Sequence, residues 1–246
     1  GLFIYTLTNF ESRATIDVDF LLRGYSNSID DVKELICKII DTPTGNDYIE
    51  MRAKGFEEIS PQRKYHGIST QIIAQIKNVR VPFNVDIGVG DIIVPRAEER
   101  IISTQLPDFE SPIIKTYSLE STIAEKFDAI LQRLELTGRM KDFYDIYYLS
   151  RTFDFDGMKL QSAVFETLQR RETPYDKDSF ERVITLADNE DIKKRWRYFL
   201  RTIKDDTLEF SFVITEIKTF LEPVFNAIAG ESVWQKKWFC RELKWL

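Results

Sequence analysis

The sequence predicts an α+β fold, in which a mixed sheet with flanking helices is followed by a C-terminal helical bundle. Two stretches of the first half alternate apolar and polar residues, as strands buried on one face do. From Ser118 onward, apolar residues instead recur every three or four positions, the period of amphipathic helices. Strands that precede helices in this way indicate two parts, which we place at residues 1–115 and 116–246.

The first acidic strand is expected within residues 13–22, where β-branched and aromatic residues dominate. Asp17 and Asp19 would lie together on one face, roughly 6–7 Å apart. At that distance two carboxylates can hold a divalent cation, although a solvated sheet face also alternates acidic and apolar residues. The opposite face would enter a core through four apolar side chains, Ile16, Val18, Phe20 and Leu22.

A second acidic strand is expected within residues 79–91, with Val81, Phe83, Val85 and Ile87 on its apolar side. Asp86 lies on the polar side, and Gly88 and Gly90 leave room there for a ligand or a neighbouring backbone. If the two strands are neighbours, Asp86 joins the first two aspartates in a cluster. Three carboxylates suit Mg²⁺, a hard cation that completes its shell with water and phosphate oxygens.

The rest of the first half predicts a helix and a hairpin. Ser28 is expected to cap a helix whose buried stripe is Val32, Leu35, Ile36, Ile39 and Ile40. Residues 68–76 and 79–89 form the two strands of the hairpin. The single histidine, His66, is expected to be a solvated loop residue rather than a catalytic base. Three further segments are assigned loosely: a helix or strand at 2–7, a strand or short helix with a loop at 48–66, and a loop at 94–112.

The second half predicts a helix capped by Ser118 and further helices at 140–149, 157–171, 180–187, 192–203 and 210–229, and then a Trp-rich terminal helix. Tyr147 and Phe165 are among the side chains expected to face inward. Lys126 lies on the first of these helices, and Lys141 and Asp145 are four residues apart on the second. A lysine could neutralise phosphate charge and an aspartate could orient it, or the pair could be an ordinary helix salt bridge.

Composition bounds the class of protein. Of 246 residues, 43% are hydrophobic and 30% are charged, which suits a folded chain with a substantial core. No run is apolar enough to span a bilayer and no signal peptide is evident, so a cytoplasmic protein without membrane partners is expected. Cys37 and Cys240 lie among apolar residues and are expected to be buried free thiols. The sequence does not begin with Met, and we expect the natural protein to extend upstream.

A formal net charge of −6 repels nucleic acid, so a polynucleotide partner needs a local basic patch. The helix at 192–203 and the chain terminus carry such residues, with Trp196 and Tyr198 interleaved: Lys193, Lys194, Arg195, Arg197, Arg201 and Lys204, and then Lys236, Lys237, Trp238, Arg241 and Lys244. The alternative is a solvated helix face with Trp196 buried beneath it.

Four segments, in this order, resemble the AbiEii-type nucleotidyltransferases, toxins of type IV toxin–antitoxin and abortive-infection systems in bacteria. The segments are Ser-Arg-Ala-Thr-Ile-Asp-Val-Asp-Phe at 12–20, Phe-Asn-Val-Asp-Ile-Gly-Val-Gly-Asp at 83–91, Ala-Glu-Lys-Phe-Asp-Ala-Ile at 124–130, and Arg-Met-Lys-Asp-Phe-Tyr-Asp-Ile-Tyr-Tyr-Leu at 139–149. The resemblance covers roughly residues 1–150. It implies a nucleotidyltransferase core like that of DNA polymerase β.

The resemblance also implies roles for individual residues. Asp17, Asp19 and Asp86 match the family's metal-binding carboxylates, and Lys126 matches a lysine that meets the nucleoside triphosphate. Either Asp142 or Asp145 matches a further acidic position. Gly1 is the sole match to the glycine turn that holds phosphates, and Arg13 in the first segment is a further candidate for nucleotide binding.

The implied activity is Mg²⁺-dependent transfer of a nucleotide from a nucleoside triphosphate to RNA, plausibly tRNA, or to a protein. Two metal ions about 4 Å apart would activate the attacking oxygen and stabilise the leaving pyrophosphate. A cognate antitoxin is a possible partner, and DNA is not expected as one. The alternative is a non-catalytic module that uses the same fold to bind a nucleotide or a partner.

Overall fold

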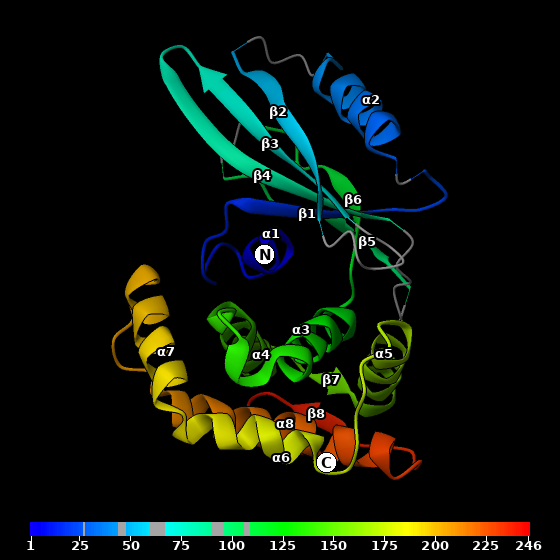
Figure 1. Cartoon of the computed structure of the whole chain (residues 1–246), viewed down its shortest axis with the longest axis vertical. Coiled ribbons are helices and arrows are strands. Elements are labelled where there is room, and N and C mark those ends of the chain that lie inside the picture. The colour runs from blue at the N-terminus through cyan, green and yellow to red at the C-terminus, as the bar shows by residue number, and fades with distance from the viewer. Residues whose placement is uncertain (27, 44–47, 60–66, 90–95, 106–108) are drawn as a thin grey trace. The chain divides into compact units, whose positions relative to one another are not determined.

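The computed structural model describes residues 1–26, 28–43, 48–59, 67–89, 96–105 and 109–246. The chain divides into two compact units (Figure 1), formed by the described parts of 1–92 with 102–112 and of 93–101 with 113–246. The predicted α+β class is confirmed, because the first unit contains a mixed sheet and the second is mainly helical. His66, Gly90 and Asp91 lie outside the described residues.

The first unit is built on a four-stranded sheet with the order β1-β4-β3-β2. Strands β1 and β4 run parallel, whereas β3 is antiparallel to both of its neighbours. The predicted hairpin is confirmed by the pairing of Ile76 with Val79. The elements of this unit are α1 (Leu2–Leu7), β1 (Asp17–Leu22), α2 (Ile29–Ile40), β2 (Glu50–Ile59), β3 (Gly67–Ile76) and β4 (Val79–Val89).

Helix α2 covers one face of this sheet (Figure 1). Its cap is confirmed, since Ser28 Oγ accepts a hydrogen bond of 3.1 Å from the backbone N–H of Asp31, a contribution of about 1 kcal/mol. The core beneath the helix consists of Val32, Ile36, Ile68, Ile72, Val85 and Ile87. Ile39 is 57% exposed, so its predicted burial is wrong. The helix packs on the sheet through Val32, Ile36 and Ile40, and Ile39 lies beside this row of side chains.

Strand β1 is less buried than the sequence suggests. Ile16 precedes the strand and is 73% exposed, and Phe20 is 51% exposed, so the prediction that both enter the core is wrong. The reason is the strand order. Helix α2 packs against β2 at one edge of the sheet, whereas β1 is the strand at the opposite edge.

The second unit begins with a short hairpin, so the loop predicted at 94–112 is partly a strand. Its helices then pack chiefly as α3 on α5, α3 on α4 and α4 on α8. The elements are β5 (Glu98–Ile101), β6 (Ile113–Thr116), α3 (Leu119–Arg133), the 3-10 turn Leu134–Leu136, α4 (Met140–Thr152), β7 (Phe155–Asp156), α5 (Gly157–Arg170), α6 (Ser179–Thr185), the 3-10 turn Leu186–Asp188, α7 (Glu190–Thr202), α8 (Phe210–Ala229), β8 (Lys237–Phe239) and β9 (Lys244–Trp245). The cap of α3 by Ser118 and the bounds of α8 agree with the prediction.

The chain terminus is a small sheet rather than the predicted helix. Strands β7, β8 and β9 pair in that order. The indole N–H of Trp238 donates to the Ser150 carbonyl oxygen at 2.6 Å, and that of Trp245 donates to the Phe220 carbonyl oxygen at 2.9 Å. Buried indole groups need such partners, and extended strands direct both rings onto the Phe220 side of α8.

Four side chains are more exposed than the sequence predicts. Phe165 is 41% exposed, so its predicted inward position is wrong, and Tyr147 is only half-buried. Cys37 and Cys240 are free thiols, as predicted, but each is half-buried rather than buried. Burial raises the pKa of the Cys240 thiol above its ordinary value.

Candidate functional site

The aspartates of β1 and β4 lie on one face of the first unit's sheet. Asp19 is the register partner of Asp86, and Asp17 is the partner of Asn84, two residues before Asp86. Partners on parallel strands project to the same face, so all three carboxylates share the face opposite the α2 core. The expectation that the two strands are neighbours is therefore confirmed.

Polar neighbours hold two of these carboxylates. Ser69 Oγ donates to Asp86 Oδ1 at 2.6 Å from the adjacent strand β3, and Asn84 Nδ2 lies 3.5 Å from Asp17 Oδ1. Asp17 and Asp86 are half-buried and Asp19 is exposed. Among the described residues, no ion pair involves any of the three aspartates. Ser69, which the sequence analysis missed, is placed beside Asp86 by the hairpin register.

The carboxylate oxygens of Asp17, Asp19 and Asp86 are ligands of the type that hard divalent cations prefer, and the three residues share one face of the sheet. In the described part of the chain, however, no three His, Cys, Asp or Glu side chains are already gathered as a metal site. Like charges repel, and a bound cation would draw the three carboxylates together. Gly88 follows Asp86 on the same face, and a Cβ atom built there would be no closer than 3.7 Å to its neighbours. No close backbone therefore requires this glycine.

A second group of charged residues lies within the second unit. Lys126 Nζ of α3 contacts Asp145 Oδ2 at 2.6 Å and Asp142 Oδ1 at 3.4 Å, both from α4. The lysine side chain is 13% exposed, and the two carboxylates are 2% and 0% exposed. Burying charges is costly unless they are paired, so this group stabilises the α3–α4 contact only while it is complete.

Arg139 completes this group. It is the N-terminal cap residue of α4, and its Nε donates to Asp142 Oδ2 at 2.6 Å while Nη2 donates to Asp142 Oδ1 at 3.4 Å. Arg139 is a site residue that was not predicted from the sequence, although its spacing of three residues from Asp142 is a helix-pair signal. The ion pair found for Asp145 is made with Lys126 rather than with Lys141, the partner that the four-residue spacing suggested.

The proposed phosphate-turn residues lie near the start of β1. A Cβ atom at Gly1 would lie 2.5 Å from Thr15 Oγ1, so a side chain there requires a shift. Thr15 Oγ1 in turn donates to the Asp17 carbonyl oxygen at 3.3 Å. Arg13 is half-buried in the connector between α1 and β1. The Thr15 side chain therefore lies against Gly1 and also bonds the backbone of Asp17.

The basic helix α7 uses several of its cations for ion pairs and hydrogen bonds. Lys193 pairs with Glu190 at 2.9 Å, and Lys194 pairs with Asp191 at 3.1 Å. Arg195 Nη1 donates to the carbonyl oxygens of Glu135 and Thr137, at 2.9 and 2.7 Å. Trp196 is 1% exposed and packs on Phe199 and Phe210, as the alternative prediction held.

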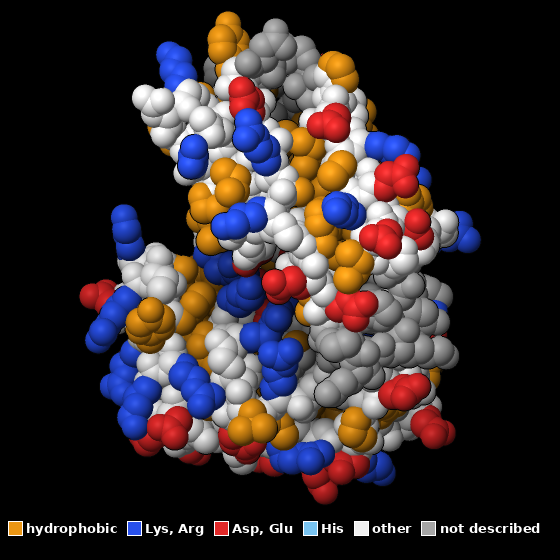
Figure 2. All heavy atoms as spheres, turned by 45° about the horizontal axis from the view of Figure 1, so that its top comes forward, with side chains coloured by type: hydrophobic (Ala, Val, Ile, Leu, Met, Phe, Trp, Pro, Cys, Tyr) orange, Lys and Arg blue, Asp and Glu red, His pale blue; other side chains and the backbone are white. Residues whose placement is uncertain are grey.

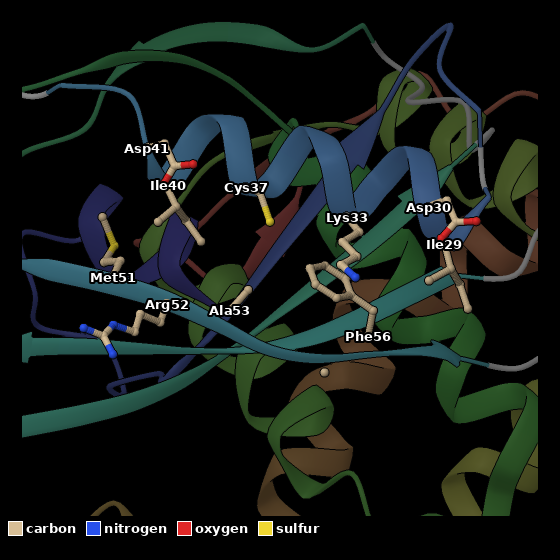
Figure 3. A pocket seen from close by; sticks show the side chains of 11 residues that line it. Ile29, Asp30, Lys33, Cys37, Ile40, Asp41, Met51, Arg52, Ala53 and Phe56 are labelled. Atoms are coloured by element: carbon tan, nitrogen blue, oxygen red, sulfur yellow. The ribbon is translucent and has the colours of Figure 1, made fainter.

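A cavity of about 540 Å³ lies between α2 and β2, on the sheet face opposite the aspartates (Figure 3). Its walls mix apolar and charged side chains, and the Lys33 side chain lies beside the Phe56 ring. None of the candidate site residues lines this cavity. It is separate from the acidic face.

A family model described as the nucleotidyl transferase AbiEii toxin of type IV toxin–antitoxin systems matches residues 1–228. The match covers both units and most of the chain, which defines the class of this protein as a nucleotidyltransferase. The chain belongs to the AbiEii toxin family. No curated protein matches the sequence.

Two solved structures from Helicobacter pylori are similar to this chain. One is a presumed nucleotidyltransferase with 10% sequence identity and a TM-score of 0.46, and the similarity covers 92% of this chain and 84% of the other. The second is JHP933, with 11% identity, a TM-score of 0.43 and coverage of 89% and 79%. The family assignment rests on the family model alone. Within the described residues, no helix is long and apolar enough to cross a membrane.

Proposed function

We propose that this nucleotidyltransferase is Mg²⁺-dependent and that it modifies RNA. The observation that carries the metal site is the register of β1 and β4, which sets Asp19 beside Asp86 with Asp17 on the same face. Asp17, Asp19 and Asp86 would hold the ions. When bound, these ions supply activation of the acceptor oxygen and stabilisation of the leaving pyrophosphate.

Lys126 is proposed to bind the triphosphate of the substrate nucleotide. Its Nζ is held at 2.6 Å from the buried carboxylate of Asp145, so the ammonium group has a fixed position before the nucleotide arrives. A fixed cation offsets charge on the phosphates without the reorganisation that a mobile side chain needs. The family suggests a nucleotide substrate and an antitoxin partner.

The outer face of α7 supports RNA as the acceptor. Lys194, Arg197, Tyr198 and Arg201 follow one another at helical spacing and are exposed, and the Tyr198 ring is 71% exposed. Figure 2 shows Lys and Arg side chains gathered on the left-hand side, where Figure 1 draws α7. A row of cations that can contact the phosphates of a nucleic-acid strand, beside an aromatic ring on which a base can stack, is typical of proteins that bind single-stranded nucleic acid.

Incubation with Mg²⁺ and α-labelled nucleoside triphosphates, in the presence of total RNA and total protein, tests both points. We expect label in RNA with the wild-type chain and none with Asp19→Asn. Label in protein alone would overturn the RNA acceptor and leave the transferase intact. Binding of nucleotide without transfer to either would favour the alternative of a non-catalytic binding module.

The α7 surface is tested separately by Arg197→Glu with Arg201→Glu. We expect weaker RNA binding and a log–log salt slope reduced by about 1 for each lost phosphate contact. Lys159→Glu with Arg170→Glu on α5 is the control, since it makes the same charge change at exposed sites. Equal losses in both double variants would indicate general repulsion rather than a site on α7.

A further inference from the structure

Two cations of the second unit share one buried carboxylate. Asp142 accepts Arg139 through both of its oxygens, and its Oδ1 also lies 3.4 Å from Lys126 Nζ. We infer that Arg139 is a second triphosphate-binding residue and that Asp142 positions it. This inference rests on the proposed role of Lys126, because the two cations meet at one carboxylate.

The exposure of the four side chains supports a ligand role for the cations. Asp142 and Asp145 are 0% and 2% exposed, whereas Lys126 is 13% and Arg139 is 43% exposed. The carboxylates are thus on the inner side and the cations on the outer side of the group. A nucleotide phosphate that reaches this group meets the cations before the carboxylates.

The distances show that the two aspartates contact different cations most closely. Asp145 makes the short contact with Lys126, at 2.6 Å, and Asp142 makes the short contact with Arg139, also at 2.6 Å. Each carboxylate therefore orients a different cation. This assigns both acidic residues of the Lys-Asp-Phe-Tyr-Asp segment, which the sequence alone left as alternatives.

The guanidinium holds Asp142 in a defined orientation. It carries five N–H donors in a planar fork, and the contact with Asp142 uses Nε and Nη2. The backbone beneath it is also fixed. The Arg139 N–H donates to Thr137 Oγ1 at 3.1 Å, and Arg195 of α7 bonds the Thr137 carbonyl oxygen. A lysine at this position would keep the positive charge but could not form the bidentate contact with the carboxylate.

Arg139→Lys tests the inference, with Arg151→Lys as the matched control. Arg151 is 37% exposed and contacts Glu216, which is 17% exposed, at 2.6 Å, so this variant alters an arginine–carboxylate pair outside the group. We expect Arg139→Lys to raise KM for the nucleoside triphosphate about tenfold or more. A loss of stability alone would lower the fraction of active protein and leave KM unchanged. The control should keep the wild-type KM.

Binding of nucleoside tri-, di- and monophosphates gives a second readout, which a purely structural role would not change. The wild-type chain should lose affinity with each phosphate removed, and Arg139→Lys should flatten this series, because the lost contact is to the phosphates. Asp142→Asn should flatten it as well. If Arg139→Lys and Arg151→Lys behave alike in KM and in the phosphate series, Arg139 is only a structural residue.

Different results would overturn the role of Arg139 and the proposed transferase. Normal Arg139→Lys kinetics, with transfer still abolished in Asp19→Asn, would overturn the role of Arg139 and leave the proposed transferase in place. A wild-type chain that neither binds nor uses nucleoside triphosphates would overturn both.

Discussion

Both units carry neighbouring carboxylates, but the surroundings of these carboxylates differ. On the sheet face of the first unit, Asp17 and Asp86 are half-buried and Asp19 is exposed, with an amide and a hydroxyl as neighbours. In the second unit, Asp142 and Asp145 are buried against Lys126 and Arg139. We therefore expect the first group to contribute little to stability and the second group to contribute more.

This difference separates function from stability. Removing a charge from a cluster of like charges does not weaken a fold, and it relieves some repulsion. Removing one partner of a buried ion pair leaves the other charge buried and uncompensated. The same change, Asp to Asn, should therefore have different consequences in the two units.

The largest effect is expected for Asp19→Asn and Asp86→Asn in the first unit. Transfer activity should fall by a factor on the order of 10²–10³ or more, since charge stabilisation at the reacting phosphate is lost. The free energy of unfolding, measured in urea, should be unchanged or slightly higher. Asp41→Asn at the end of α2 is a control with normal activity. Near wild-type turnover in either site variant would show that the sheet face is not the metal site.

Asp145→Asn tests the contribution of the buried charged group in the second unit to stability. It removes the negative charge that lies 2.6 Å from Lys126 Nζ, so we expect the free energy of unfolding to fall by about 3 kcal/mol, together with a loss of activity. Urea unfolding of this variant beside Asp19→Asn measures the contrast directly. If the two variants lost the same stability, the expected difference between the two groups in their contribution to folding would be wrong.

Lys126→Ala should give an intermediate result. It weakens nucleotide use, because a cation for the phosphates is lost, and it lowers stability, because two buried carboxylates lose a partner. Binding of Mg²⁺ or Mn²⁺ to the first unit should not change. Kinetics that stay the same across nucleotide concentrations would leave Lys126 a structural residue only.

The smallest effect concerns Asp154, an exposed carboxylate of the second unit. The backbone N–H of Cys240 donates to Asp154 Oδ1 at 2.8 Å, and this bond holds the pKa of Asp154 below its ordinary value of 3.8. A lowered pKa means that the contribution to stability is present at neutral pH and is lost as the pH falls through the native pKa. Asp154→Asn should be slightly less stable than the wild type at pH 7, and the two curves should converge below the native pKa of Asp154, which lies under 3.8. Parallel curves would contradict this.

The sequence predicts much of the acidic face because local periodicity determines it. Alternation along 79–89 gives the side of the strand on which Asp86 lies, and the hairpin gives its neighbour β3. The pairing of β1 with β4 is a contact between distant segments, and only the shared chemistry of the aspartates suggested it. The exposure of Ile16 and Phe20 depends on which strand lies at the sheet edge, which periodicity does not encode.

The charged group of the second unit was harder to derive. Helical spacing favoured a pair of Lys141 and Asp145, but packing of α3 on α4 brings Lys126 to Asp145 instead. Arg139 precedes α4, so it lies outside the periodic pattern that identified the helix. The terminal sheet was missed for a related reason, since its strands contain only two or three residues each and are fixed by tryptophan contacts with α8.

The most direct test of the central claim is a thermal-unfolding experiment with Mg²⁺, a nucleoside triphosphate, or both. Each ligand supplies charge that the other lacks, so their binding to the carboxylates should be cooperative. We expect a clear rise in melting temperature with both ligands together and little with either alone. At a hundred times the dissociation constant, bound ligand adds about 2.7 kcal/mol to the free energy of unfolding. Asp19→Asn should show no rise. An equal rise with nucleotide alone, or the same rise in Asp19→Asn, would contradict a metal-assisted nucleotide site at Asp17, Asp19 and Asp86.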